Sequence, residues 1–149
     1  MSKKGASGPK VVTGVIRMVI AAAKAAPSPP VGPALGQKGL NIMDFCKDFN
    51  GATKDYGPET PVPVLITAYS DRTFTYTMKS PPTTWFLKRA AGVKKGANTP
   101  GLQTVGEVSL KSVYEIAKIK RGDMNVASLD AACKCVIGTC RSMGLKVVE

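Results

Sequence analysis

Seven residues near the end of the chain, Gly138 to Gly144 (GTCRSMG), combine groups that can bind a nucleic-acid backbone. Two hydroxyl groups and one guanidinium lie between two glycines, and these groups can hydrogen-bond to phosphate and 2′-hydroxyl oxygens. Because glycine has no side chain, the backbone there can come close to a ligand. The same pattern also suits the C-terminal end of an ordinary helix, with a glycine cap and solvated polar residues. From these residues alone, both interpretations remain.

The residue types argue against catalysis. The chain has no histidine, which removes the usual general base, the Ser/His and Cys/His nucleophile pairs and every histidine metal site. A phosphate-binding loop needs four residues between its glycines and Ser or Thr after its lysine, whereas three residues separate Gly32 from Gly36 and a glycine follows Lys38. Asp44 and Asp48 lie off the apolar face of a predicted helix, where solvation accounts for them. We therefore predict no catalytic residue.

The four cysteines are Cys46, Cys133, Cys135 and Cys140. The last three follow a C-x-C-x4-C pattern within one predicted helix, where cysteines two positions apart point to different faces. Structural zinc sites usually contain paired C-x2-C motifs instead. We therefore expect no metal, no cofactor, and reduced, mostly buried thiols that suit a reducing compartment. No apolar run approaches the length of a membrane span, so no membrane partner is expected.

The net charge indicates a polyanionic partner. Lys and Arg number 21 against 10 Asp and Glu, which gives +11 and a pI near 9.7. Residues 1–79 carry 10 basic and 5 acidic side chains, and residues 80–149 carry 11 and 5. Because neither half is a charged tail, a folded surface must make the contact. Nucleic acid is the simplest such partner, and a merely basic, soluble protein is the alternative.

A proline-rich segment precedes the first predicted helix. Four prolines lie within the seven residues from Pro27 to Pro33, and glycines lie at positions 32, 36 and 39. Proline fixes φ and pushes the preceding residue toward extended geometry, so we predict a stiff ledge with polyproline II geometry. A helix from Asn41, its N-cap, to about Lys54 should follow. Such a ledge suits presenting a surface to a partner or gripping a nucleic-acid backbone, rather than forming a catalytic pocket.

Hydrophobic periodicity predicts an α+β fold with two small lobes. Residues 1–79 should form an α/β unit with a three-stranded sheet, its strands at 11–20, 64–69 and 73–78. Residues 80–84 (SPPTT) should form a stiff linker, and residues 85–149 a three-helix unit. In that unit, helices are expected from Thr83 or Thr84 and after the caps Ser109 and Ser128. A polar loop is expected at 96–106 and a short terminal strand at 145–148, with Trp85, Phe86 and Tyr114 in the core.

Two segments resemble the family of large-subunit ribosomal protein eleven, found in bacteria and organelles. Residues 27–50 are similar to PxPPVGPALGQxGxNIMxFCKxFN, and GTCRSMG departs from the family's GTARSMG only at Cys140. Three further segments also resemble the family: FLKRAAGVKKG at 86–96, VYEIAKIK at 113–120 and DMN at 123–125. The resemblance covers roughly residues 11–148, with both lobes in the family's order.

The resemblance implies a structural constituent of the large ribosomal subunit, not an enzyme. It would bind large-subunit rRNA at the GTPase-associated region, help translational GTPases act and lie beside ribosomal stalk proteins. The family pattern assigns rRNA contact to Lys88, Arg89, Lys94, Lys95, Asn125, Gly138, Thr139, Arg141, Ser142, Met143 and Gly144. It assigns Pro27, Pro30 and Pro33 to a face that meets thiopeptide antibiotics and translational GTPases. For the four lysines and arginines at 88–95, plain solvation is the competing interpretation.

Two further questions concern the function class and the compartment. A non-ribosomal RNA-binding or protein adaptor module is the alternative function, although a protein adaptor leaves the charge unexplained. The segments at 86–97 and 113–120 look more like mitochondrial members than bacterial ones. No acidic residue precedes Asp44, which is compatible with organelle import. We therefore expect the mitochondrial matrix and its ribosome, with the bacterial cytoplasm as the alternative.

Overall fold

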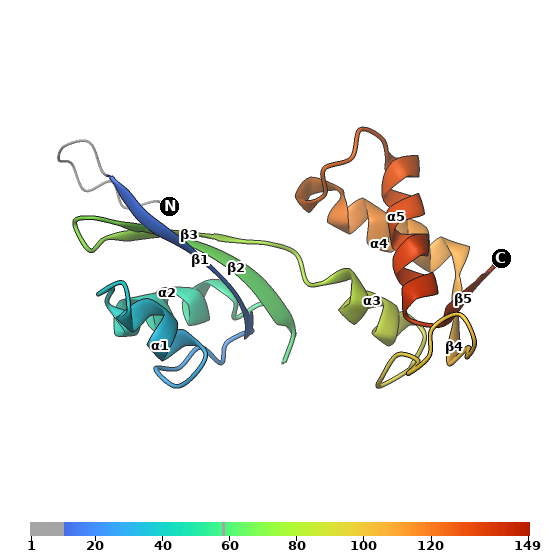
Figure 1. Cartoon of the computed structure of the whole chain (residues 1–149), viewed down its shortest axis with the longest axis horizontal. Helices are drawn as coiled ribbons and strands as arrows, with labels where there is room; N and C mark the ends of the chain where they lie inside the picture. The colour runs from blue at the N-terminus through green and yellow to red at the C-terminus, as the bar shows by residue number, and fades with distance from the viewer. Residues whose placement is uncertain (1–10, 58) are drawn as a thin grey trace. The chain divides into compact units, whose positions relative to one another are not determined.

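The computed structural model describes residues 11–57 and 59–149. The chain divides into two compact units, Met1–Lys79 and Ser80–Glu149. The first contains a three-stranded sheet with two helices, and the second contains three α-helices with a two-stranded sheet (Figure 1). The predicted α+β class is therefore confirmed. Within the described part of the chain, no helix is long and apolar enough to cross a membrane.

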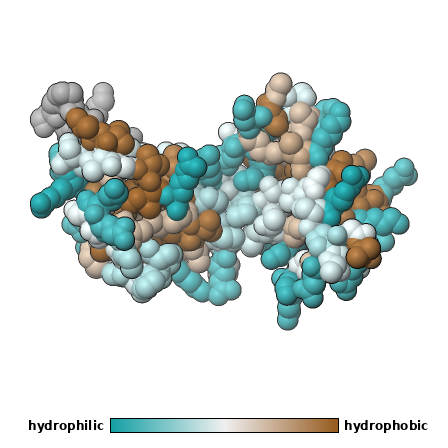
Figure 2. Space-filling model, in the orientation of Figure 1, coloured by the Kyte–Doolittle hydropathy of each residue, from teal (hydrophilic) through white to brown (hydrophobic). Residues whose placement is uncertain are grey.

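The sheet of the first unit is antiparallel, in the order β1-β2-β3. Its strands are β1 (Val12–Ala21), β2 (Pro61–Tyr69) and β3 (Phe74–Met78). Alternate residues of β2 are buried, which is the period expected for a sheet with one covered face. On the other face Val15 and Val19 are exposed, and Figure 2 shows hydrophobic surface in the region of β1. The three predicted strands are confirmed.

Helices α1 (Val31–Gly36) and α2 (Ile42–Ala52) cover the inner face of this sheet (Figure 1). Asn41 caps α2 as predicted, and its side chain accepts hydrogen bonds from the backbone N–H groups of Met43 and Asp44. Phe45 lies at the centre of the core, with its ring 5.8 Å from that of Phe49 and 5.7 Å from that of Tyr76. These aromatic contacts join α2 to β3 and fix the helix on the sheet.

The predicted extended ledge from Pro27 to Pro33 is wrong for residues 31–33, because α1 (Val31–Gly36) already begins at Val31. Pro33 lies in the first turn of α1, where a missing N–H costs no intrahelical hydrogen bond. Before the helix the chain turns tightly: the N–H groups of Val31 and Gly32 donate to the Ser28 carbonyl at 3.2 and 3.3 Å. The Pro29–Pro30 peptide bond is cis. Proline rules applied residue by residue therefore do not give the shape of this segment.

The second unit packs its helices around one core. Its elements are α3 (Thr83–Ala90), β4 (Gly106–Ser109), α4 (Leu110–Lys120), the 3-10 helix η1 (Arg121–Asp123), α5 (Leu129–Ser142) and β5 (Leu145–Val148). Ser109 and Ser128 cap α4 and α5 as predicted, each accepting a backbone N–H. Leu87, Val113 and Val136 meet at the core. Trp85 and Phe86 are half-buried, but Tyr114 is 46% exposed, so its predicted core position is wrong.

Strand β4 begins at Gly106, the last residue of the segment predicted as a polar loop, and continues to the helix cap Ser109. It pairs in parallel with β5, from Gly106 opposite Leu145 to Ser109 opposite Val148. A parallel partner lies far away in sequence, and four residues carry too little periodicity to indicate a strand by themselves. The predicted terminal strand is confirmed, and its partner is an addition that the sequence pattern missed.

The expected linker at 80–84 is part of the second unit. The Ser80 N–H donates to the Asp123 carboxylate at 2.7 Å, the Ser80 hydroxyl bonds to the same oxygen, and the Lys120 ammonium donates to the Ser80 carbonyl at 3.2 Å. Pro81 is buried, and α3 already begins at Thr83. The proline pair therefore leads directly into α3, within the second unit.

Candidate nucleic-acid interface

Helix α5 has one buried face and one exposed face. Ala132, Val136 and Cys140 are buried at intervals of four residues and face the core. On the other side of the helix, Cys135, Gly138, Arg141 and Ser142 are exposed, and Thr139 is half-buried. Residues three and four positions apart are neighbours on a helix surface. Most of the polar part of GTCRSMG is thus presented to solvent on one continuous helical face.

The two hydroxyl groups of this face already donate within the helix. The Thr139 hydroxyl donates to the Cys135 carbonyl at 3.0 Å, and the Ser142 hydroxyl donates to the Thr139 carbonyl at 2.8 Å. A hydroxyl that uses its proton in this way keeps its oxygen free to accept. The face therefore offers hydrogen-bond acceptors at residues 139 and 142 beside the donors of Arg141. Acceptors of this kind suit the 2′-hydroxyl protons of RNA.

The two glycines of the motif have different structural roles. A Cβ atom on Gly138 would meet nothing within 4 Å, so the fold does not require glycine there. Gly144 has φ +72°, and a Cβ atom on it would lie 2.5 Å from the Ala97 Cβ and 2.6 Å from the Gln103 carbonyl oxygen. Only glycine fits that position. The open surface at Gly138 permits close approach of a ligand, whereas Gly144 serves packing.

Gly144 lies where the loop before β4 packs on the end of α5. The Ala97 N–H donates to the Met143 carbonyl, and the Val105 N–H donates to the Gly144 carbonyl, both at 2.9 Å. Residues 97–105 are therefore fixed to the end of α5 at both of their ends. The exposed Lys94 and Lys95 lie just before this attachment. The fold thus links the basic loop to the GTCRSMG motif.

Comparison with known protein families identifies both units. Residues 79–147 match the family model described as ribosomal protein L11, RNA binding domain, and residues 16–74 match ribosomal protein L11, N-terminal domain. The two matches follow each other in the order of the two structural units and span most of the chain. The chain belongs to the ribosomal protein L11 family. It is accordingly an rRNA-binding protein of the large ribosomal subunit, with a structural role and not an enzymatic one.

Within the L11 RNA-binding domain, the residues predicted to contact rRNA fall into separate groups. Met143 and Gly144 are buried, so they pack inside the domain and do not belong to the exposed face of the motif. On α3 the Arg89 guanidinium lies 5.4 Å from the centre of the Trp85 ring, and Lys88 is half-buried. Arg89 borders a groove between α3 and α4, whereas Arg141 borders a different pocket at the end of α5. Asn125 is exposed between η1 and α5.

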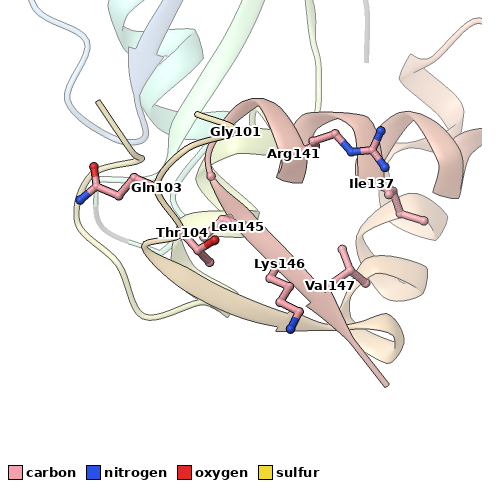
Figure 3. Close-up of a pocket in the computed structure, with 9 residues that line it drawn as sticks. Gly101, Gln103, Thr104, Ile137, Arg141, Leu145, Lys146 and Val147 are labelled. Atoms are coloured by element: carbon pink, nitrogen blue, oxygen red, sulfur yellow. The ribbon is translucent and has the colours of Figure 1, made fainter. Parts of the chain in front are cut away.

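Sequence reasoning missed several residues beside the L11 motif. Gln103, Thr104 and Lys146 line one pocket together with Arg141 (Figure 3). The exposed Lys146 was accessible to prediction, since it alternates with buried Leu145 in the expected terminal strand. Gln103 and Thr104 could not be predicted, because they belong to a loop that is attached to α5 by contacts between residues distant in sequence.

The cysteines of this L11-family chain are all free thiols. Cys46 and Cys140 are buried, and burial raises the pKa of each thiol. Cys133 is half-buried and Cys135 is exposed on the same face as Gly138, so the expectation of mostly buried thiols is met by only two of the four. Cys140, which replaces the alanine of the expected motif, lies in the core and does not disturb the exposed face.

The prolines predicted to face translation factors lie in the L11 N-terminal domain. Pro27, Pro30 and Pro33 are all exposed. A Cβ atom on the buried Gly32 would lie only 2.1 Å from the Pro27 carbonyl oxygen, so glycine is needed for this tight turn. The three prolines therefore belong to a surface whose backbone is held by α1 and the turn that precedes it.

Proposed function

We propose that this chain binds large-subunit rRNA at the GTPase-associated region through the exposed face of α5, and that its N-terminal unit helps translational GTPases act. The observation that carries the proposal is the open surface at Gly138, flanked by the acceptors of Thr139 and Ser142 and the donors of Arg141. Lys94 and Lys95, which lie just before the loop residues fixed to the same helix end, supply further charge for phosphate groups.

The binding chemistry follows from these groups. The Arg141 guanidinium offers a planar set of donors to a phosphate, and such charge-assisted bonds are stronger than neutral ones. The hydroxyl oxygens of Thr139 and Ser142 accept from 2′-hydroxyl groups, which DNA lacks. Absence of a side chain at Gly138 lets the RNA backbone lie against the helix. The face therefore distinguishes RNA by its sugar and its shape, while Lys88, Arg89 and Asn125 are proposed to make contacts around it.

The factor-facing role is assigned to Pro27, Pro30 and Pro33. Their exposure and the fixed backbone around Gly32 mean that little conformational entropy is lost when a partner binds. We assign translational GTPases, thiopeptide antibiotics and the ribosomal stalk proteins to this unit as transient or neighbouring partners. The mitochondrial ribosome is the proposed location, on the likeness of residues 86–97 and 113–120 to mitochondrial members, with a bacterial ribosome as the alternative.

Titration of the full-length chain with transcribed large-subunit rRNA tests the RNA-binding face. Thr139→Ala and Arg141→Ala should each weaken binding by about 1–3 kcal/mol, because each removes a contact to the RNA. Lys118→Ala, an exposed charge on α4, is the control and should have little effect. Unchanged affinity for both α5 variants, with their helical circular dichroism intact, would place the RNA elsewhere on the protein.

A separate assay tests the factor-facing surface. The double variant Pro30→Ala/Pro33→Ala should bind rRNA as the wild type does, because those contacts are assigned to the other unit. On reconstituted ribosomes it should reduce factor-stimulated GTP hydrolysis and relax thiopeptide inhibition. If the variant loses only thermal stability, with GTP hydrolysis changed in proportion, the prolines serve the fold and not the factors.

A further inference from the structure

A pocket of about 320 Å³ opens beside the exposed face of α5, within the second unit (Figure 3). Its lining comes from three places: α5, the strand β5 and the loop that packs on the end of α5. Ile137 and Arg141 come from α5, Lys146 and Val147 from β5, and Thr104 from the loop. The volume lies at the lower end of the ~300–1,000 Å³ found for small-molecule sites.

The chemistry of the lining is mixed in a specific way. Ile137, Leu145 and Val147 supply aliphatic surface, and the first and third of these are only half-buried. The charged groups are Arg141 and Lys146, which come from different elements. Among the nine described residues that line the pocket there is no carboxylate. An apolar wall with cations from two elements and no acid favours a ligand that has an apolar face and carries anions.

We propose that this pocket receives one unstacked nucleotide of the bound rRNA. The base would lie against Ile137 and Val147, and Arg141 and Lys146 would meet the phosphates on its two sides. Sequence-specific RNA recognition mostly uses bases turned out of the stack, so a nucleotide-sized recess beside a backbone-binding face fits that mode. The proposal rests on the proposed function, since it extends the α5 face, and it adds a position at which the RNA is read by a base.

The groove between α3 and α4 shows why this pocket is the better candidate. That groove, of about 470 Å³, is bordered by Arg89 and Lys111 but also by the carboxylate of Glu115. A negative charge at the edge repels phosphate groups. The α5 pocket has no such charge in its lining, and it shares Arg141 with the proposed RNA-binding face.

Paired variants of the full-length chain test the pocket against transcribed large-subunit rRNA. Ile137→Ala should weaken binding about 5-fold with an unchanged salt dependence, because it removes apolar contact with a base and no charge. Lys146→Ala should weaken binding and lower the salt slope by about one, because it removes a phosphate contact. The matched controls are Ile119→Ala and Lys118→Ala on the exposed side of α4. If each pocket variant behaves as its control does, no nucleotide enters the pocket.

Nuclear magnetic resonance gives a second readout that does not depend on the RNA. Adenosine, guanosine, cytidine or uridine 5′-monophosphate should shift the amide signals of residues 104, 137 and 146 in the full-length chain. Inorganic phosphate is the control, and it should leave the signal of residue 137 unchanged. If no mononucleotide shifts that signal more than phosphate does, the proposal is overturned. An effect of Thr139→Ala on rRNA affinity, without any effect of the pocket variants, would retain the proposed function and reject only the pocket.

Discussion

Replacing Gly144 with alanine should destabilise the second unit strongly. The residue has φ +72°, and a side chain in this left-handed region costs about 1–2 kcal/mol. The added Cβ would also lie 2.5 Å from the Ala97 Cβ and 2.6 Å from the Gln103 carbonyl oxygen. Overpacking of this kind typically costs about 1–3 kcal/mol. We therefore expect Gly144→Ala to lower the free energy of unfolding of this unit by about 2–5 kcal/mol.

The single tryptophan of the chain makes this prediction measurable for one unit alone. Trp85 lies in the second unit, with its ring 5.1 Å from that of Phe86, so its fluorescence reports unfolding of this core. A urea titration followed by tryptophan emission gives the free energy of unfolding. A loss at the lower limit of 2 kcal/mol would lower the melting temperature by roughly 8–16 °C for a domain of this size.

Gly92→Ala is the matched control, because Gly92 has φ +65° but nothing lies within 4 Å of an added Cβ. It should show the conformational cost alone, about 1–2 kcal/mol. The difference between the two variants then measures the collision at Gly144. If Gly144→Ala costs no more than Gly92→Ala, the loop accommodates the added Cβ without cost, and the reasoning is refuted.

Three further outcomes are expected. Gly138→Ala should raise the stability of the second unit by about 0.5–1 kcal/mol, since glycine is a poor helix former. The same variant should weaken binding in the rRNA titration. Unchanged binding would mean that the RNA backbone does not approach residue 138. Gly32→Ala should lower the melting temperature of the first unit, because its Cβ would lie 2.1 Å from the Pro27 carbonyl oxygen. The unfolding transition seen by Trp85 fluorescence should stay unchanged. A shift of that transition would contradict the assignment of Gly32 to the first unit alone. Maleimide should label Cys135 before Cys140 at neutral pH, and mass spectrometry can follow the order of labelling. Cys135 is exposed, whereas burial raises the pKa of Cys140 and so lowers its thiolate fraction. Equal labelling of the two would contradict the burial of Cys140.

Local chemistry predicted most of the elements. Asn41, Ser109 and Ser128 mark helix starts because their side chains accept N–H groups that no carbonyl of the helix can reach. The strands of the first sheet follow from β-branched residues around a short turn. Both kinds of signal are confined to a few consecutive residues, so they can be read without knowledge of the rest of the fold.

The missed features depend on contacts between distant residues. Strand β4 exists only because β5 lies beside it, and α1 forms where proline rules alone favour extended chain. The sequence motif suggests a ligand-binding role for Gly144, but its burial depends on contacts with Ala97 and Gln103, in a loop far away in the sequence. The motif itself can be recognised from the sequence. That Gly138 is open to solvent and Gly144 is closely packed depends on the three-dimensional fold.

The pairing of β5 with β4 also has a consequence for biosynthesis. All three strands of the first unit are present once Met78 has been made, so that unit can fold while the rest of the chain is still being translated. The second unit acquires its sheet only after residues 145–148 have emerged, because β4 has its parallel partner there. Until then the surface that Leu145 covers stays open to solvent. A nascent chain can thus carry a folded N-terminal unit while its RNA-binding unit still lacks the pairing of β4 with β5.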